Sequence, residues 1–307
     1  MTTLRESGAA LRTRRCIVCG SSGPFAELYQ QSRFRLVKCG CGLVFQDPQP
    51  DEKMLEDSYY HDSAFSEALV GELRQITIDN ACHKRRLLRA AGVRLEGMRI
   101  LDIGASSGAW LEVASAEGCR ATGVEIGATT AGGARSRGLD VRTGTLEEVL
   151  PTFDDERFDL ITFWDVLEHL PDPRRELAMA RALLTADGLI AATFPNVEGL
   201  YPKITYRLLS RPTGVWEYPE LPVHLYDFAP RTARRLLAGQ GYEVRLIRTF
   251  AIPYGYYRST SLSPERLGSG LRARLLRAVF DALHRVVYPL AQASDRGNSM
   301  FVLAGAS

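Results

Sequence analysis

Four cysteines near the start of the sequence have the spacing of a metal site. They form two close pairs, Cys16-x2-Cys19 and Cys39-x-Cys41, with glycines that allow tight turns beside each pair. In a reducing compartment such a cluster is more often a metal site than a pair of disulfides. Four thiolates suit tetrahedral Zn²⁺. The sequence therefore predicts a structural zinc held by a small ribbon over residues 1–50.

A turn of small residues further along has the chemistry of a ligand cradle. Asp102 precedes a turn that contains Gly104, Ser106 and Gly108, and a helix is expected directly after it. Small residues let a ligand lie against the backbone, and a helix start offers free N–H groups. Glu125 ends the next expected strand, where a carboxylate can accept two hydrogen bonds from a ribose diol. Asp102 favours a positively charged ligand over a pyrophosphate, whereas an acid at the position of Glu125 is shared with nicotinamide enzymes.

A second block with chemical potential follows the fourth expected strand. The apolar run 158–163 leads into Trp164-Asp165, and Glu168-His169 comes directly afterwards. Ligands of open α/β sheets bind at the carboxyl ends of the strands, which is where Asp165 is expected to lie. We therefore place this exit on the ligand side of the sheet.

Alternating strand and helix patterns supply the frame for these residues. An α/β fold with a mostly parallel sheet and helices on both faces is expected from such alternation. The expected strands are 99–103, 121–125, 139–142, 158–163, 188–194, 242–248 and 299–304, and the expected helices are 79–91, 109–117, 129–137, 173–184 and 230–238.

Composition narrows the functional classes. The chain has 307 residues, of which 45% are hydrophobic and 24% charged, and its net charge is +2. These values are typical of a globular protein and provide no basic field for a long nucleic acid. No run of 18 apolar uncharged residues is present, and the start lacks a secretory signal. We expect a cytoplasmic protein without a transmembrane segment.

The glycine turn and the strand-four exit together resemble the motifs of class I S-adenosylmethionine-dependent methyltransferases. Ser106 stands where the family has a middle glycine. The resemblance implies a Rossmann-like sheet of seven strands with the last antiparallel, and S-adenosylmethionine as cofactor. The positions that match the family's cofactor-binding motifs are Asp102, Gly104, Ser106, Gly108, Glu125, Thr145, Leu146, Trp164 and Asp165.

The segment 39–50 resembles the zinc ribbon fused to some bacterial methyltransferases of sugars and secondary metabolites. In those enzymes the ribbon helps to shape the substrate side. The expected organisation is a ribbon over 1–50, a helical connector and lid over 51–95, and a cofactor-binding domain over 96–307 with insertions at 195–228 and 253–297.

Methyl transfer is an in-line displacement from sulfur, so the protein mainly aligns the acceptor and removes its proton. His224 is the first candidate for the general base, with a loop anchor as its structural alternative, and His169 is the second. The aromatic residues of the insertion 195–228 are expected to shape the acceptor pocket. Tyr59, Tyr60 and His61 can reach this pocket from the ribbon side.

The leading functional prediction is methyl transfer to oxygen of a small-molecule or sugar acceptor, in bacterial secondary metabolism or glycan biosynthesis. An RNA-modifying methyltransferase that binds RNA through the ribbon is the alternative. A nicotinamide oxidoreductase is opposed by Asp102 and the missing glycines. A non-catalytic protein that holds the cofactor without turnover is also considered. The sequence leaves the acceptor and the oligomeric state open.

Residues 271–290 combine apolar positions at helical spacing with several arginines. Two structures fit this pattern. The helix can pack on its own domain with the arginines outward, which we favour, or lie on a membrane surface.

Overall fold

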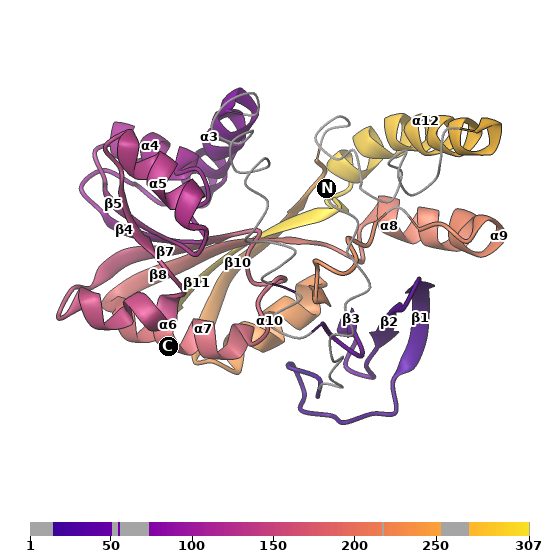
Figure 1. Ribbon diagram of the computed structural model, residues 1–307, viewed down its shortest axis with the longest axis horizontal. Helices are drawn as coiled ribbons and strands as arrows, with labels where there is room; N and C mark the ends of the chain where they lie inside the picture. The colour runs from indigo at the N-terminus through magenta and orange to yellow at the C-terminus, as the bar shows by residue number, and fades with distance from the viewer. Residues whose placement is uncertain (1–14, 51–54, 56–73, 217, 253–269, 307) are drawn as a thin grey trace.

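The structure is a computed structural model that describes residues 15–50, 55, 74–216, 218–252 and 270–306. Two sheets organise these residues, a central seven-stranded sheet and a four-stranded sheet beside it. Figure 1 presents the central sheet nearly edge-on, with the smaller sheet at the lower right. The predicted lid at the start of 51–95 lies largely outside the described residues, as do Tyr59, Tyr60 and His61.

The central sheet has the predicted topology. Its strands are β4 (Arg99–Ile103), β5 (Arg120–Glu125), β6 (Asp140–Thr143), β7 (Phe158–Trp164), β8 (Leu184–Pro195), β10 (Tyr242–Phe250) and β11 (Ser299–Ala306). They lie in the order β10-β11-β8-β7-β4-β5-β6. Only β11 runs antiparallel to its neighbours, β8 and β10, while the other pairs are parallel. The expected seven strands with an antiparallel last strand are confirmed.

Helices cover both faces of this sheet, as predicted. One face carries α3 (Arg74–Ala90), α4 (Ala109–Ala116) and α5 (Ala128–Ser136), and the other α6 (Leu146–Val149), α7 (Pro173–Leu183) and α10 (Pro230–Ala238). Local sequence explains where α7 begins. Asp172 accepts hydrogen bonds from the backbone N–H groups of Arg174 and Arg175, and a proline fills the first helical position.

The four-stranded sheet is assembled from two distant parts of the chain. It contains β1 (Ala26–Gln31), β2 (Phe34–Lys38) and β3 (Val44–Gln46) of the N-terminal module, followed by β9 (Tyr226–Asp227) of the insertion at 195–228. Val44 lies opposite Asp227 and Phe45 opposite Tyr226. The module is therefore bonded to the segment that continues into α10.

An aromatic core joins the same two parts. Trp216 is 2% exposed and packs with Leu36 and Val44 of the module. Its ring lies 5.7 Å from that of Tyr29 and 4.9 Å from that of Tyr206, and its Nε1 donates to the carbonyl of Pro202 at 3.2 Å. These aromatic side chains build a core between module and insertion.

The rest of the insertion packs against the last long helix. The insertion contains α8 (Leu200–Thr205), the π-helical turn η2 (Tyr206–Ser210) and α9 (Arg211–Thr213). Tyr201 of α8 packs with Phe280 and Val287 of α12 (Leu271–Ala293). The outward side of α12 carries apolar as well as basic residues, because Leu271 is 66% and Leu275 58% exposed. Among the described helices, none is long and apolar enough to cross a bilayer.

The aromatic core generates the first testable expectation. Trp216→Ala should lower the free energy of unfolding by about 3–5 kcal/mol, because it empties a buried site and removes a hydrogen bond. Leu208→Ala is the matched control, since that side chain is 62% exposed. Urea unfolding followed by circular dichroism measures both. Equal stabilities of the two variants would contradict the packing described for Trp216.

Candidate active site

The turn between β4 and α4 contains two glycines at which close packing excludes a side chain. Gly104 has φ of 74° and Gly108 φ of 77°, a left-handed region that glycine adopts without strain. A Cβ on Gly104 would lie 2.6 Å from Cγ2 of Val166, and one on Gly108 would lie 2.5 Å from Cδ1 of Leu139. Ser106 shares the left-handed conformation with φ of 50°. The backbone is therefore open to a ligand, and α4 begins at Gly108 without a side-chain cap among the described residues.

Asp102 lies at the end of β4, directly under this turn. It is 2% exposed, and its Oδ1 accepts a hydrogen bond from Thr162 Oγ1 on the neighbouring strand at 2.6 Å. Burial raises the pKa of Asp102 to about 7, against the opposing effects of Thr162 and of the Lys84 charge. A cation beside this carboxylate would replace the hydration that burial removes.

Glu125 ends β5 and ties the turn together. Its Oε2 accepts from the backbone N–H of Ser106 at 2.8 Å, and its Oε1 accepts from the N–H of Gly127 at 2.8 Å. Burial raises the pKa of Glu125, while these two N–H groups lower it. Each carboxylate oxygen can accept a second hydrogen bond, so both can also accept from the hydroxyl groups of a ligand.

The remaining predicted cofactor residues lie at the start of α6 and at the end of β7. Thr145 caps α6, forming a capping box with Glu148, and Leu146 is 2% exposed in the core. Trp164 packs edge-on to Trp110 at 5.4 Å between ring centroids. Asp165 follows Trp164 in the left-handed conformation, with φ of 58°.

Lys84 of α3 is a site residue that sequence reasoning missed. Its Nζ lies 5.4 Å from the centre of the Trp164 ring. Burial lowers its pKa, and the nearby carboxylates of Asp165, Asp102 and Glu168 oppose that shift. Lys84 is thus the basic side chain that faces the acids of this edge from α3. A single lysine on a basic helix gives no sequence signal for such a role.

The two predicted histidines lie together near the end of β7. The segment 165–170 that follows β7 is called the strand-seven exit below. The ring centroids of His169 and His224 lie 4.6 Å apart, and Nδ1 of His169 contacts the carbonyl of Val223 at 3.1 Å. His224 Nε2 lies 3.7 Å from a carboxylate oxygen of Glu220. Burial lowers the pKa of His169 to about 3 and that of His224 to about 4. Both imidazoles are therefore neutral near pH 7.

Two buried carboxylates accompany the histidines. Glu168 is 0% and Asp227 1% exposed, and the oxygens of both side chains lack hydrogen-bond donors within the part of the chain that is described. Burial raises the pKa of Glu168 well above its usual range, and the charge of Asp165 adds to this. Burial likewise raises the pKa of Asp227 to about 7. Glu168, the residue before His169, is thus a candidate site residue to which the sequence analysis assigned no role.

The N-terminal module contacts the backbone of His224 through Gln46. Gln46 is 0% exposed, and its Nε2 donates to the carbonyls of Pro222 at 2.8 Å and His224 at 2.6 Å. The N–H of Gln46 donates to the carbonyl of Leu225 at 2.9 Å. A glutamine has no distinctive spacing, so sequence reasoning did not single it out.

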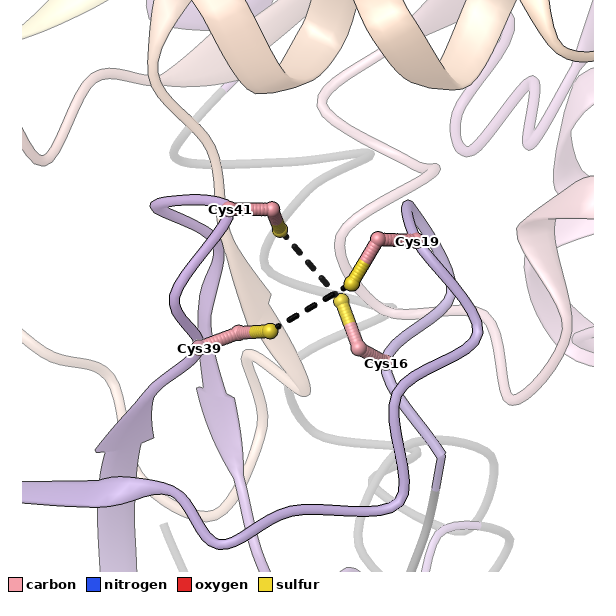
Figure 2. A group of neighbouring side chains, drawn as sticks. All are labelled: Cys16, Cys19, Cys39 and Cys41. Atoms are coloured by element: carbon pink, nitrogen blue, oxygen red, sulfur yellow. Dashed lines mark hydrogen bonds between the residues drawn. The ribbon is translucent and has the colours of Figure 1, made fainter.

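The four predicted cysteine ligands converge. Figure 2 shows their side chains pointing toward one another from two loops. The Sγ atoms of Cys16 and Cys41, and those of Cys19 and Cys39, are 3.5 Å apart, and all four lie within 4.8 Å of one another. Tetrahedral zinc with Zn–S distances of about 2.3 Å separates its sulfurs by about 3.8 Å. The donor set and its spacing therefore fit zinc.

Comparisons with known proteins agree with this geometry. Residues 74–247 match the family model described as a methyltransferase domain. A ubiquinone biosynthesis O-methyltransferase of Pasteurella multocida is 32% identical over 110 residues, which is 31% of this chain and 46% of that enzyme. The enzyme of the same name from Coxiella burnetii is 26% identical over 158 residues, covering 47% of this chain and 67% of its own. The chain thus spans less than half of the first relative.

Solved structures share the fold. The magnesium protoporphyrin IX methyltransferase of Synechocystis with bound SAH superposes with a TM-score of 0.53 at 14% identity, over 84% of this chain and 100% of that one. The same enzyme with bound SAM gives a TM-score of 0.50 at 13% identity, over 84% and 98% of the two chains. At such low identity the likeness establishes the architecture.

Gln46→Ala tests the link between the module and His224. The change leaves the carbonyls of Pro222 and His224 buried without their donor, which should cost roughly 1–3 kcal/mol of unfolding free energy. It should also shift the His224 resonances in a ¹H–¹⁵N imidazole NMR spectrum. Gln30→Ala is the control, because that side chain is exposed. An unchanged His224 signal in Gln46→Ala would remove Gln46 as a positioning residue.

Proposed function

We propose that this chain, which belongs to the methyltransferase domain family, is an S-adenosylmethionine-dependent methyltransferase that methylates a hydroxyl of a small-molecule acceptor. Cofactor binding is assigned to the β4 turn, and acceptor binding to the strand-seven exit and its histidines. The observation that carries the proposal is the buried carboxylate of Asp102 and the half-buried carboxylate of Glu125, which flank a turn where Gly104 and Gly108 leave no room for a side chain.

The cofactor fits this turn by charge and by shape. S-adenosylmethionine carries a sulfonium and an ammonium group, and Asp102 offers a carboxylate that lacks the solvation of an exposed acid. The ribose hydroxyls find two acceptor oxygens on Glu125. Gly104 allows the amino-acid part to approach the backbone. Thr145, Leu146, Trp164 and Asp165 remain predicted contacts of the nucleoside.

The reaction needs little covalent chemistry from the protein. The acceptor oxygen forms a bond to the methyl carbon as the carbon–sulfur bond breaks, and sulfur keeps the electron pair as a neutral thioether. The hydroxyl proton must leave as this happens. His224 and His169 lie together on the proposed acceptor side, which supports their predicted place in the removal of this proton.

Oxygen is favoured over nitrogen or carbon because both curated relatives are named O-methyltransferases. A sugar or secondary metabolite as acceptor rests on the resemblance of the N-terminal module alone. Transfer of a labelled methyl group from the cofactor to a panel of phenols, sugars and amines tests this choice. Label found only on amines would overturn the assignment to oxygen.

We assign a structural zinc to the four converging cysteines. Cys39 and Cys41 lie between β2 and β3, and β3 contains Gln46 and pairs with β9. Removal of the ion would loosen the loop before β1 and the turn between β2 and β3, because the four cysteines of these two segments would lose their common link.

Cofactor affinity tests the two carboxylates directly. Asp102→Ala and Glu125→Ala should each weaken binding by about tenfold or more, since charged hydrogen bonds contribute roughly 1.5–3 kcal/mol. Isothermal titration calorimetry with S-adenosylmethionine measures this effect. Glu147→Ala is the control, because its side chain is 53% exposed on α6. Full affinity in both variants, or binding of a nicotinamide dinucleotide instead, would contradict the proposal.

The pH dependence of affinity provides a separate test of Asp102. Its pKa of about 7 means that the carboxyl is neutral below pH 7 and charged above it. Attraction for a cation should therefore grow as pH rises through about 7. Asp102→Asn removes this titration and leaves that of the cofactor, so the wild-type slope between pH 6 and 8 should exceed the variant's. Parallel slopes would show that Asp102 does not sense the ligand's charge.

A further inference from the structure

The strand-seven exit brings together a second set of metal-ligand side chains, separate from the cysteines. Glu168 and His169 lie on the turn after β7, and His224 lies two residues before β9. One donor atom of each residue lies within 4.8 Å of the donors of the other two. Three residues from two distant segments therefore converge on one point.

The carboxylate of Glu168 faces this point without a partner. Its side chain is 0% exposed, and neither oxygen meets a hydrogen-bond donor among the residues that the structure describes. Its backbone carbonyl accepts from the N–H groups of Leu225 and Tyr226 at 2.9 and 3.2 Å, while its own N–H lowers the pKa of the carboxyl against the larger effect of burial. Burial of a carboxylate with no donor is costly unless a cation or a proton neutralises it.

The tautomer of His169 suits a metal ligand. The carbonyl of Val223 can only accept, so Nδ1 carries the proton and Nε2 is the unprotonated nitrogen. A backbone carbonyl on the second ring nitrogen is the usual support of a metal-binding histidine. The ring is thus oriented by the same loop that supplies His224.

We propose that Glu168, His169 and His224 bind a divalent cation of the zinc type, in a site distinct from the four cysteines. Two imidazoles and one carboxylate suit Zn²⁺, Co²⁺ or Fe²⁺ better than Mg²⁺, which prefers oxygen ligands. Zinc–nitrogen distances of about 2.0–2.1 Å place donor atoms about 3.4 Å apart, so closure needs side-chain movements of about 1 Å. Three protein ligands leave at least one position open.

The surrounding charges favour a cation. Asp165, Glu220 and Asp227 act electrostatically on Glu168. Lys84, from α3, interacts electrostatically with Glu168 and Asp165. A divalent ion at this point would be attracted by these carboxylates.

Use of the ion in catalysis rests on the proposed function, whereas its binding does not. An acceptor hydroxyl in the open position would lose its proton to water more readily, because a bound cation lowers the pKa of a coordinated O–H group. The oxygen then takes the methyl group as the carbon–sulfur bond breaks. The histidines would act as ligands, in place of the general base expected from the sequence.

Metal content tests the site without any assay of turnover. The purified full-length chain is dialysed against Zn²⁺ and then against buffer, and its zinc is measured by mass spectrometry. We expect about two ions per chain in the wild type and about one in Glu168→Gln and in His224→Gln. Glu176→Gln is the matched control, because Oε2 of Glu176 also lacks a partner but lies on α7, outside the histidine pair. It should keep both ions.

Two results would overturn the proposal. One is a single ion in wild type and variants alike, which would mean that Glu168 is neutralised by a proton. The other is an unchanged second ion in Glu168→Gln. Cobalt substitution of the wild type covers the case in which the variants do not fold. Nitrogen- and oxygen-ligated Co²⁺ should appear beside the thiolate-ligated ion, and a purely thiolate spectrum would reject the site.

Discussion

Burial of carboxylates at one edge of the sheet is the constraint on which the candidate site depends. Asp102 and Glu168 are removed from water, and neither forms an ion pair in the described part of the chain. Such groups remain charged only when a cation or several donors approach them. The two acids lie at the same edge because β4 and β7 are parallel neighbours whose carboxyl ends meet. The site is thus a place where the protein lacks positive charge that ligands can supply.

Two kinds of cation answer two kinds of carboxylate. Asp102 lies beside a turn in which Gly104 and Gly108 lack side chains, which suits an extended organic cation. At the strand-seven exit, Glu168 has imidazoles beside it, which suit a compact inorganic one. Lys84 lies within the reach of both groups. Burial lowers the pKa of Lys84, whereas the nearby carboxylates of Asp165, Asp102 and Glu168 favour its charged form.

The sequence predicted the central sheet well because each strand there has a local signal. The run before Gly104 and the run before Asp165 are apolar and bounded by turns, so β4 and β7 could be placed from their own residues. Glu125 was predicted as a ligand from its place at the end of a strand, and the cysteines were predicted as ligands from their spacing. Gln46, Lys84 and Asp227 were missed because their importance arises from contacts between segments far apart in the chain. The insertion's aromatic residues were expected around an acceptor, whereas Trp216 fills a core, since a buried ring and a pocket ring look alike in a sequence.

The pairing of β3 with β9 has a consequence for how this architecture can be recombined. A chimaera that moves only residues 1–50 onto another catalytic domain would carry an unpaired edge at Val44 and Phe45, and a core missing Trp216. A faithful graft must bring the stretch 195–228 as well. Inheritance of the module and of that stretch is therefore coupled, and exchange of one without the other would scramble the loop that holds His224.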